Sequence, residues 1–218
     1  TKCSRCGFVS QHNEPTYDMV VDIPLQPAGK DGDHKRAQPL TVEECLRHFT
    51  AVEVLADQPY KCAHCRKAST HAERQIRLQT VPRYLFVVLK RFTWDAEEQD
   101  YRKVQARVGV REHIDLTPYM AAEVTSVTDK LQSLSRKAAA VAEELPPESQ
   151  GRLKAVVCHH GELMTEGHYT AYCRIGDTWW HFHDDKVQRA TFNEVRKNSS
   201  CTGYILCYEI LDDNDAVS

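Results

Sequence analysis

The residues best suited to chemistry in this sequence are one histidine and two pairs of cysteines. His168 lies in the run EGHYTAYCR (residues 166–174), directly after a glycine and at the start of a strand-like segment. Gly167 lets a ligand backbone approach closely, and an imidazole with an ordinary pKa of about 6.5 can serve as a general base near neutral pH. A histidine that begins a strand is also common as a purely structural residue. The base hypothesis therefore depends on the residues around it.

A second polar cluster interrupts apolar strand sequence downstream of this histidine, in WWHFHDDKV (residues 179–187). A carboxylate from this run can orient an imidazole, as the acid does in catalytic triads. A thiol protease needs a histidine and an acid held close together, with a cysteine from elsewhere in the chain. Two strands that carry His168 and an aspartate could provide the first two groups.

Four of the nine cysteines form two Cys-x-x-Cys pairs. These are Cys3 with Cys6, and Cys62 with Cys65. Four thiolates complete the tetrahedral shell of a structural zinc ion and leave no open position for catalysis, so we expect structural Zn²⁺ here. Zinc needs reduced thiols, which points to the cytoplasm or the nucleus.

The other five cysteines lie in apolar runs, where a free cysteine commonly packs as a small hydrophobic residue. They are Cys45, Cys158, Cys173, Cys201 and Cys207. An odd number of cysteines in a chain that is not a short secreted scaffold argues against a disulfide framework.

Composition narrows the class of protein. The chain has 218 residues, a length that suits a globular protein of one domain or two small ones. Its formal net charge is −3. It has no basic stripe with interleaved aromatic residues, so we expect no nucleic-acid partner and reject a zinc-dependent nucleic-acid module. It has no apolar window of about 18 residues, so we expect no membrane span. Because residue 1 is not methionine, we expect the chain to be a piece of a longer polypeptide.

The hydrophobic pattern predicts an α+β fold dominated by an antiparallel sheet. A helix is expected in LTVEECLRHF (residues 40–49), where Thr41 and Glu44 form a capping-box pattern. Residues 84–92 are expected to form a central strand and residues 104–116 a strand pair. Further strands are predicted at residues 17–25, 75–78, 155–161, 168–176, 178–184 and 202–210.

Residues 121–150 differ from the rest of the chain and are rich in Ala, Glu, Ser and Lys. Apolar residues recur every three or four positions, which predicts one helix inserted between strands. These residues are Val127, Leu131, Leu134, Ala138, Val141 and Leu145. The sharper alternative is a helix that docks a partner.

Taken in order, these motifs resemble the ubiquitin-specific protease family of cysteine deubiquitinases. The matching runs are the two Cys-x-x-Cys knuckles, LTVEECLRHF, VPRYLFVVLKRF, IDLTPYM, HHG at 159–161, GHYTAYCR, WWHFHDDKV and GYILCYE. They cover nearly the whole chain apart from the helical insert and the acidic tail. The ordered set is specific, although no single motif decides the matter.

The resemblance implies a papain-like palm with an antiparallel sheet and zinc-stapled β-hairpin fingers, in a partial domain that lacks the thumb. It assigns the fingers to residues 1–80 and the palm to residues 81–120 and 151–211, with an insert at 121–150 and an acidic tail at 212–218. It implies hydrolysis of isopeptide or peptide bonds at the C-terminal glycine of ubiquitin. Ubiquitin and ubiquitinated proteins are then the expected partners, and His168 is the expected general base.

The sequence departs from the family pattern at the nucleophile. The family carries its catalytic cysteine in an Asn- and Gly-rich box upstream of the first knuckle, and no such box occurs here. We therefore expect the nucleophile to lie upstream of Thr1 and the isolated chain to be inactive. The alternative is a catalytically inactive pseudo-protease that binds ubiquitin as a scaffold.

A second departure concerns the orienting residue. The family places Asn or Asp directly after the Phe of the WWHF run and a second Asp next to it, whereas this chain has His183 followed by Asp184. A neutral imidazole cannot offer an anion to the protonated base. We expect Asp184 to be the orienting acid, provided that a turn brings it to the right face of the strand, and His183 to be the fallback.

Overall fold

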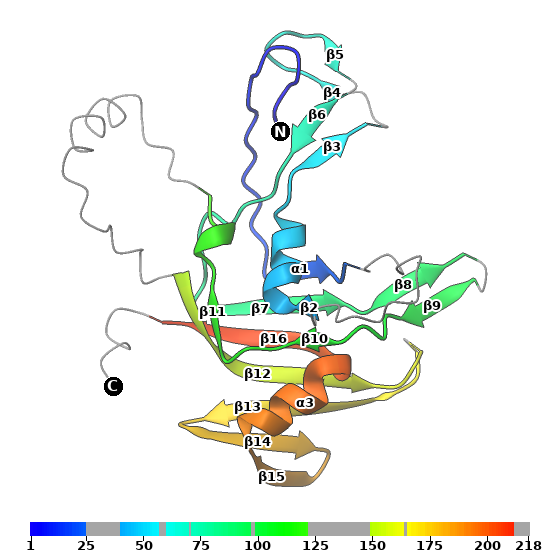
Figure 1. The fold of residues 1–218 in the computed structure, drawn as a ribbon, viewed down its shortest axis with the longest axis vertical. Coiled ribbons are helices and arrows are strands. Elements are labelled where there is room, and N and C mark those ends of the chain that lie inside the picture. Colours follow the sequence, from blue (N-terminus) through cyan, green and yellow to red (C-terminus); the bar gives the residue numbers. More distant parts are fainter. Residues whose placement is uncertain are drawn as a thin grey trace, which may run out of the picture.

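A large mixed sheet forms the centre of the molecule in the computed structural model, which describes residues 1–24, 40–56, 60–69, 71–96, 99–121, 149–163 and 165–211 (Figure 1). Its strands are β1 (Met19–Asp22), β7 (Tyr84–Lys90), β11 (His113–Asp115), β12 (Gln150–His160), β13 (His168–Ile175), β14 (Thr178–His183), β15 (Lys186–Ala190) and β16 (Gly203–Ile210). They are arranged in the order β1-β7-β16-β12-β13-β14-β15, with β11 pairing β12. Every pair is antiparallel except β1 with β7, so the predicted antiparallel sheet is confirmed with one parallel edge.

A nearly continuous apolar run explains why β7 forms in the interior of this sheet, and burial alternates along it. Leu85, Val87 and Leu89 are buried, while Tyr84 and Phe86 point to the opposite, exposed face. Its neighbours are β1 on one side and β16 on the other. The central strand predicted at residues 84–92 is therefore confirmed as far as Lys90.

Four small two-stranded sheets complete the described strands. They are β2 (Leu40–Thr41) with β10 (Val108–Gly109), β3 (Glu53–Leu55) with β6 (Ala72–Arg74), β4 (Tyr60–Lys61) with β5 (Ala68–Ser69), and β8 (Phe92–Asp95) with β9 (Asp100–Lys103). The strand pair expected at residues 104–116 corresponds to β10 and β11. These two strands pair with β2 and β12 rather than with each other.

Two helices pack on the large sheet, and both begin with a capping box. In α1 (Val42–Phe49) the Thr41 side chain and the Glu44 backbone cap the first turn as predicted, and Val42, Cys45 and Leu46 are buried. The helix α3 (Phe192–Thr202) was not predicted, although its Thr191 cap and Glu194 form the same pattern. A short 3-10 turn, η1 (Thr117–Tyr119), follows β11.

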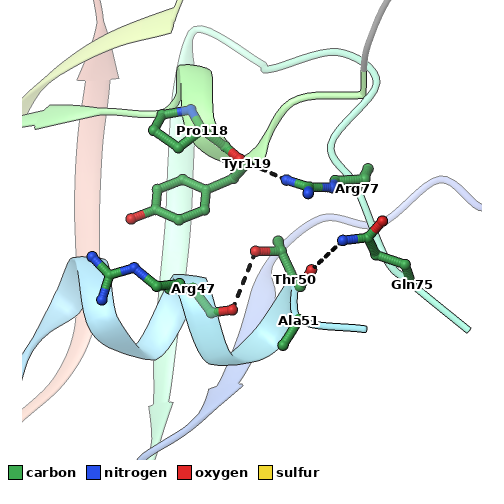
Figure 2. A pocket seen from close by; sticks show the side chains of 7 residues that line it. All are labelled: Arg47, Thr50, Ala51, Gln75, Arg77, Pro118 and Tyr119. Carbon is green, nitrogen blue, oxygen red and sulfur yellow. Dashed lines mark hydrogen bonds between the residues drawn. The ribbon is translucent and has the colours of Figure 1, made fainter. Parts of the chain in front are cut away.

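A pocket of about 260 Å³ lies between the end of α1, η1 and residues 75–77 (Figure 2). Residues 75–78 were predicted to be a strand, and that prediction is wrong, because only Leu78 makes an isolated bridge. The Gln75 side-chain amide donates to the Thr50 carbonyl at 2.9 Å, and Arg77 donates to the Pro118 carbonyl at 2.6 Å. Side-chain bonds to carbonyls on α1 and η1 thus hold this extended segment in place of a strand partner.

The fully buried side chain of Arg91 joins the large sheet and α3 to the segment that follows β9. It donates to the carbonyls of Gly203 at 2.5 Å, Ser200 at 3.0 Å, Ala106 at 3.0 Å and Val104 at 3.2 Å. Burial lowers the pKa of Arg91 from its ordinary value. The carbonyls that it contacts compensate for the removal of this charge from water.

The predicted helical insert and acidic tail fall almost entirely on residues 122–148 and 212–218, outside the described part of the chain. Among the helices that the structure describes, none has the length and apolar character needed to cross a bilayer.

Candidate functional site

The two cysteine knuckles lie together at the end of an arm that projects from the large sheet (Figure 1). We call residues 1–10 together with β3 to β6 the cysteine arm. Both knuckles have the same backbone: Gly7 donates to the Cys3 carbonyl and Arg66 to the Cys62 carbonyl, each at 2.9 Å. Gly7 and Arg66 each have a positive φ, of 71° and 56°. The knuckles are therefore two copies of one tight turn.

Backbone pairing and ring stacking join the two knuckles. Lys2 exchanges both backbone hydrogen bonds with Glu73 of β6, at 2.7 and 3.0 Å. The Phe8 and His64 rings stack with their centroids 5.2 Å apart. These contacts bring together two segments that are far apart in the sequence.

The four knuckle sulfur atoms have the spacing of a metal site. Cys3, Cys6, Cys62 and Cys65 place them all within 4.8 Å of one another. The Cys6 and Cys62 sulfurs are 3.7 Å apart, too far for a disulfide and close to the ~3.8 Å between ligands that each lie about 2.3 Å from a tetrahedral zinc. A hydrogen bond from the Cys65 backbone lowers the pKa of Cys62 to about 7, which favours its thiolate. At Cys6 a hydrogen bond from the Phe8 backbone is outweighed by desolvation and the neighbouring sulfurs, which raise the pKa to about 11. The described residues thus fit a four-thiolate metal site.

Four of the five other cysteines are suited to packing. Burial raises the pKa of Cys45 to about 12, and it also raises the pKa of Cys158, Cys173 and Cys207. A thiol whose pKa is raised stays protonated near neutral pH and is a poor nucleophile.

His168 is the first residue of β13 and is paired with His160 on the neighbouring strand β12. The preceding Gly167 has φ +152°, and a Cβ built on it would lie 2.5 Å from both His159 Nε2 and the His160 carbonyl oxygen. Only glycine fits this position, because a side chain would both strain the backbone and collide with β12. The glycine seen in the sequence therefore serves the close approach of the chain to its own β12.

Asp184 lies beside His168 because of a tight turn. It begins the two-residue connection between β14 and β15, has φ +53°, and places Oδ2 3.7 Å from His168 Nε2. Residues on one strand alternate between faces, but the left-handed turn removes Asp184 from that alternation. The same carboxylate oxygen lies 3.9 Å from His183 Nε2, so the structure brings together His168, His183 and Asp184.

His159 and His160 support the strand beneath this site. His159 is almost fully buried and makes edge contacts with the rings of Phe92 and Tyr169, and His160 Nε2 lies 2.8 Å from Thr170 Oγ1. Burial, with a smaller effect of the Lys103 charge, lowers the pKa of both histidines, so both are neutral near pH 7.

Lys103 of β9 is a site residue that the sequence analysis missed. Its ammonium donates to the His159 carbonyl at 2.6 Å and the Gly161 carbonyl at 2.8 Å. It thereby fastens the start of the connection that leads to His168. Nothing in the local sequence distinguishes this lysine from a surface lysine.

Gly167→Ala is expected to lower the free energy of unfolding by about 2–5 kcal/mol, from backbone strain and the collision with His159 and the His160 carbonyl. The matched control is Gly176→Ala, where φ is +57° and no atom lies within 4 Å of the new Cβ. That change is expected to cost about 1–2 kcal/mol from backbone strain alone. Urea unfolding of both variants checks this, and equal losses would contradict the role given to crowding.

Comparison with known sequences gives one consistent result. A family model described as "Ubiquitin carboxyl-terminal hydrolase" matches residues 2–208. Ubiquitin carboxyl-terminal hydrolase 44 of Ailuropoda melanoleuca is 34% identical over 220 residues, which cover 94% of this chain and 28% of that protein. Ubiquitin carboxyl-terminal hydrolase 3 of Homo sapiens is 31% identical over 214 residues, which cover 94% of this chain and 36% of that protein. The chain thus spans about a third of the length of these relatives.

Solved structures show the same fold. The structure of the SAGA Ubp8/Sgf11/Sus1/Sgf73 DUB module bound to ubiquitin aldehyde matches with a TM-score of 0.71 at 23% identity, over 97% of this chain and 40% of that one. A structure of the yeast SAGA DUBm matches with a TM-score of 0.69 at 25% identity, over 97% of this chain and 39% of that one. The sheet-dominated fold described above is therefore similar to that of Ubp8.

Proposed function

Since the chain belongs to the ubiquitin carboxyl-terminal hydrolase family, we propose that it supplies the general base and the orienting acid of a thiol-dependent deubiquitinase. The reaction is hydrolysis of the isopeptide or peptide bond that follows the C-terminal glycine of ubiquitin. The observation that carries this proposal is the 3.7 Å separation between His168 Nε2 and Asp184 Oδ2, at the point where β13 begins and β14 ends.

In this mechanism His168 takes the proton from a cysteine thiol. The thiolate attacks the carbonyl carbon of the scissile bond, and His168 then gives the proton to the departing amine. Water, activated by the same imidazole, hydrolyses the resulting acyl-enzyme. Asp184 orients the ring and stabilises the imidazolium, and His183 is the fallback for that role.

The nucleophilic cysteine belongs to a segment upstream of Thr1, and the chain alone is inactive. This part of the proposal is supported by the chemistry of the thiols described above. Four of them converge as metal ligands, and burial raises the pKa of Cys45, Cys158, Cys173 and Cys207.

The remaining parts of the molecule have supporting roles. We assign residues 1–80 to zinc-stapled fingers, and residues 81–120 and 151–211 to a papain-like palm, although β1 pairs with β7 in the large sheet. Cys3, Cys6, Cys62 and Cys65 would hold a structural Zn²⁺, which supplies a rigid cross-link and no reactive position. Ubiquitin and ubiquitinated proteins are the partners, in the cytoplasm or the nucleus.

The test uses a polypeptide extended upstream of Thr1 and ubiquitin that carries a C-terminal electrophile. Intact mass is expected to show one covalent ubiquitin per chain in the wild type and almost none in His168→Ala, because the thiol loses its base. An adduct that persists unchanged in His168→Ala would contradict the role of this histidine.

A second candidate function is a ubiquitin-binding scaffold without catalysis. The observation that favours it is His183, an imidazole in the position where the family pattern has Asn or Asp. A wild-type polypeptide that retains ubiquitin in a pull-down but forms no adduct would support the scaffold and exclude the hydrolase.

A further inference from the structure

The end of the β14–β15 hairpin gathers three side chains that can each bind a metal ion. The Nε2 atoms of His168 and His183 both face one oxygen, Asp184 Oδ2, at 3.7 and 3.9 Å. All the ligand atoms of the three residues lie within 4.8 Å of one another, and the two ring centroids are 4.7 Å apart. The side chains of His168, His183 and Asp184 are 41%, 47% and 68% exposed, so the cluster lies at the surface of the molecule.

These separations are too long for direct hydrogen bonds, which require at most about 3.2 Å between nitrogen and oxygen. Ligands about 2.0–2.1 Å from a tetrahedral zinc lie ~3.4 Å from one another, so the exposed Asp184 carboxylate would need to approach each nitrogen by only a few tenths of an ångström to share an ion with it. His168 Nε2 is buried and has no hydrogen-bond partner in the described ranges, so no hydrogen bond competes with an ion for this atom. Two imidazoles and one carboxylate form a donor set of borderline softness that suits Zn²⁺ and leaves its fourth position open.

We propose that His168, His183 and Asp184 form a second metal site, which binds Zn²⁺ reversibly and is distinct from the four-cysteine site. His183 determines the site, because it supplies the third ligand and lies outside the base–acid pair assigned above. The two sites differ in chemistry: the knuckles offer four thiolates, whereas this one offers nitrogen and oxygen ligands and is partly exposed.

Zinc at this position inhibits the enzyme. Because Asp184 faces Nε2, the nitrogen that accepts the thiol proton is Nδ1. With the ion on Nε2 the neutral imidazole carries its proton on Nδ1, so the ring can no longer act as a base, and the ion also neutralises the carboxylate that orients the ring. This inhibitory consequence rests on the proposed deubiquitinase function, while the metal site itself does not.

The binding test uses the polypeptide extended upstream of Thr1, with its four-cysteine site already loaded. After dialysis against micromolar Zn²⁺, atomic emission is expected to count two zinc ions per wild-type chain and one per His183→Asn chain, with affinity for the second ion reduced at least about tenfold. The matched control is His113→Asn, the same change at an exposed histidine of β11, which should still bind two. Equal zinc counts in the wild type and His183→Asn would overturn the site, as would a wild-type count of one.

The activity test is separate. If the polypeptide hydrolyses a ubiquitin C-terminal amide, micromolar Zn²⁺ is expected to slow the wild type, and the half-inhibitory concentration should rise at least about tenfold in His183→Asn. Equal zinc sensitivity of the two proteins would overturn the inhibitory role. Absence of hydrolysis at any zinc concentration would overturn the proposed function, while the zinc count would still decide the metal site.

Discussion

Cys62→Ser is expected to unfold the cysteine arm while the large sheet stays folded. Among the described residues of the arm, the buried apolar side chains are those of Cys3, Cys62 and Ala72, which is far too little apolar surface for an independent core. A structural zinc contributes roughly 10 kcal/mol or more to folding in small metal-stabilised units. Serine removes one of four ligands, so most of that contribution is lost.

Limited proteolysis and hydrogen exchange read this effect region by region. In the variant, amides of β3 to β6 should exchange within seconds, while those of β12 and β16 remain protected. The zinc occupancy of the four-cysteine site should also decrease. Cys201→Ser is the control, because Cys201 lies on α3, away from the knuckles. Retained protection of β3 to β6 in Cys62→Ser would show that the arm does not depend on the metal.

Asp184→Asn is expected to lower kcat for ubiquitin amide hydrolysis by on the order of 10⁴, with a much smaller change in KM. The amide keeps nearly the shape of the carboxylate but provides no negative charge for the imidazolium that forms on His168. Because the proposed role of Asp184 is to stabilise that imidazolium, the loss should appear in the chemical step and not in substrate binding.

The control for this prediction is Asp185→Asn, which changes the other carboxylate of the same turn and should leave kcat within about twofold. Assays at low free zinc separate this effect from metal binding. If His183→Asn lowers kcat more than Asp184→Asn does, the orienting role belongs to His183 instead.

Much of the fold follows from local sequence patterns. The nearly continuous apolar run of β7 and the closely spaced apolar segments of β12, β13 and β16 predicted their strands, and the Thr41–Glu44 pattern predicted the start of α1. The same pattern at Thr191 and Glu194 was overlooked, because α3 has few apolar residues to mark its face. The strand predicted at residues 75–78 was wrong, because side-chain bonds to α1 and η1 compete with strand pairing.

The site was harder to predict, because its geometry depends on backbone conformation and long-range packing. Cysteine spacing alone predicted the four-sulfur cluster, and the cluster is present. The nearness of Asp184 to His168 depends on one positive φ, which the residue type allows but does not require. Lys103 approaches His159 from a separate hairpin, so no pattern within a few residues could have revealed it.

The hairpin formed by β13 and β14 has a consequence for folding. His168 begins this hairpin and Asp184 follows its end, so the proposed base and acid belong to one short, continuous stretch of chain at the side of the sheet that ends in β15. Such low-contact-order units close rapidly and open as single cooperative units. Local unfolding that detaches β14 and β15 from β13 would therefore separate His168 from Asp184 while leaving β7, β16 and β12 paired. The proposed catalytic pair can thus be separated and restored in the native state at a free-energy cost below that of global unfolding.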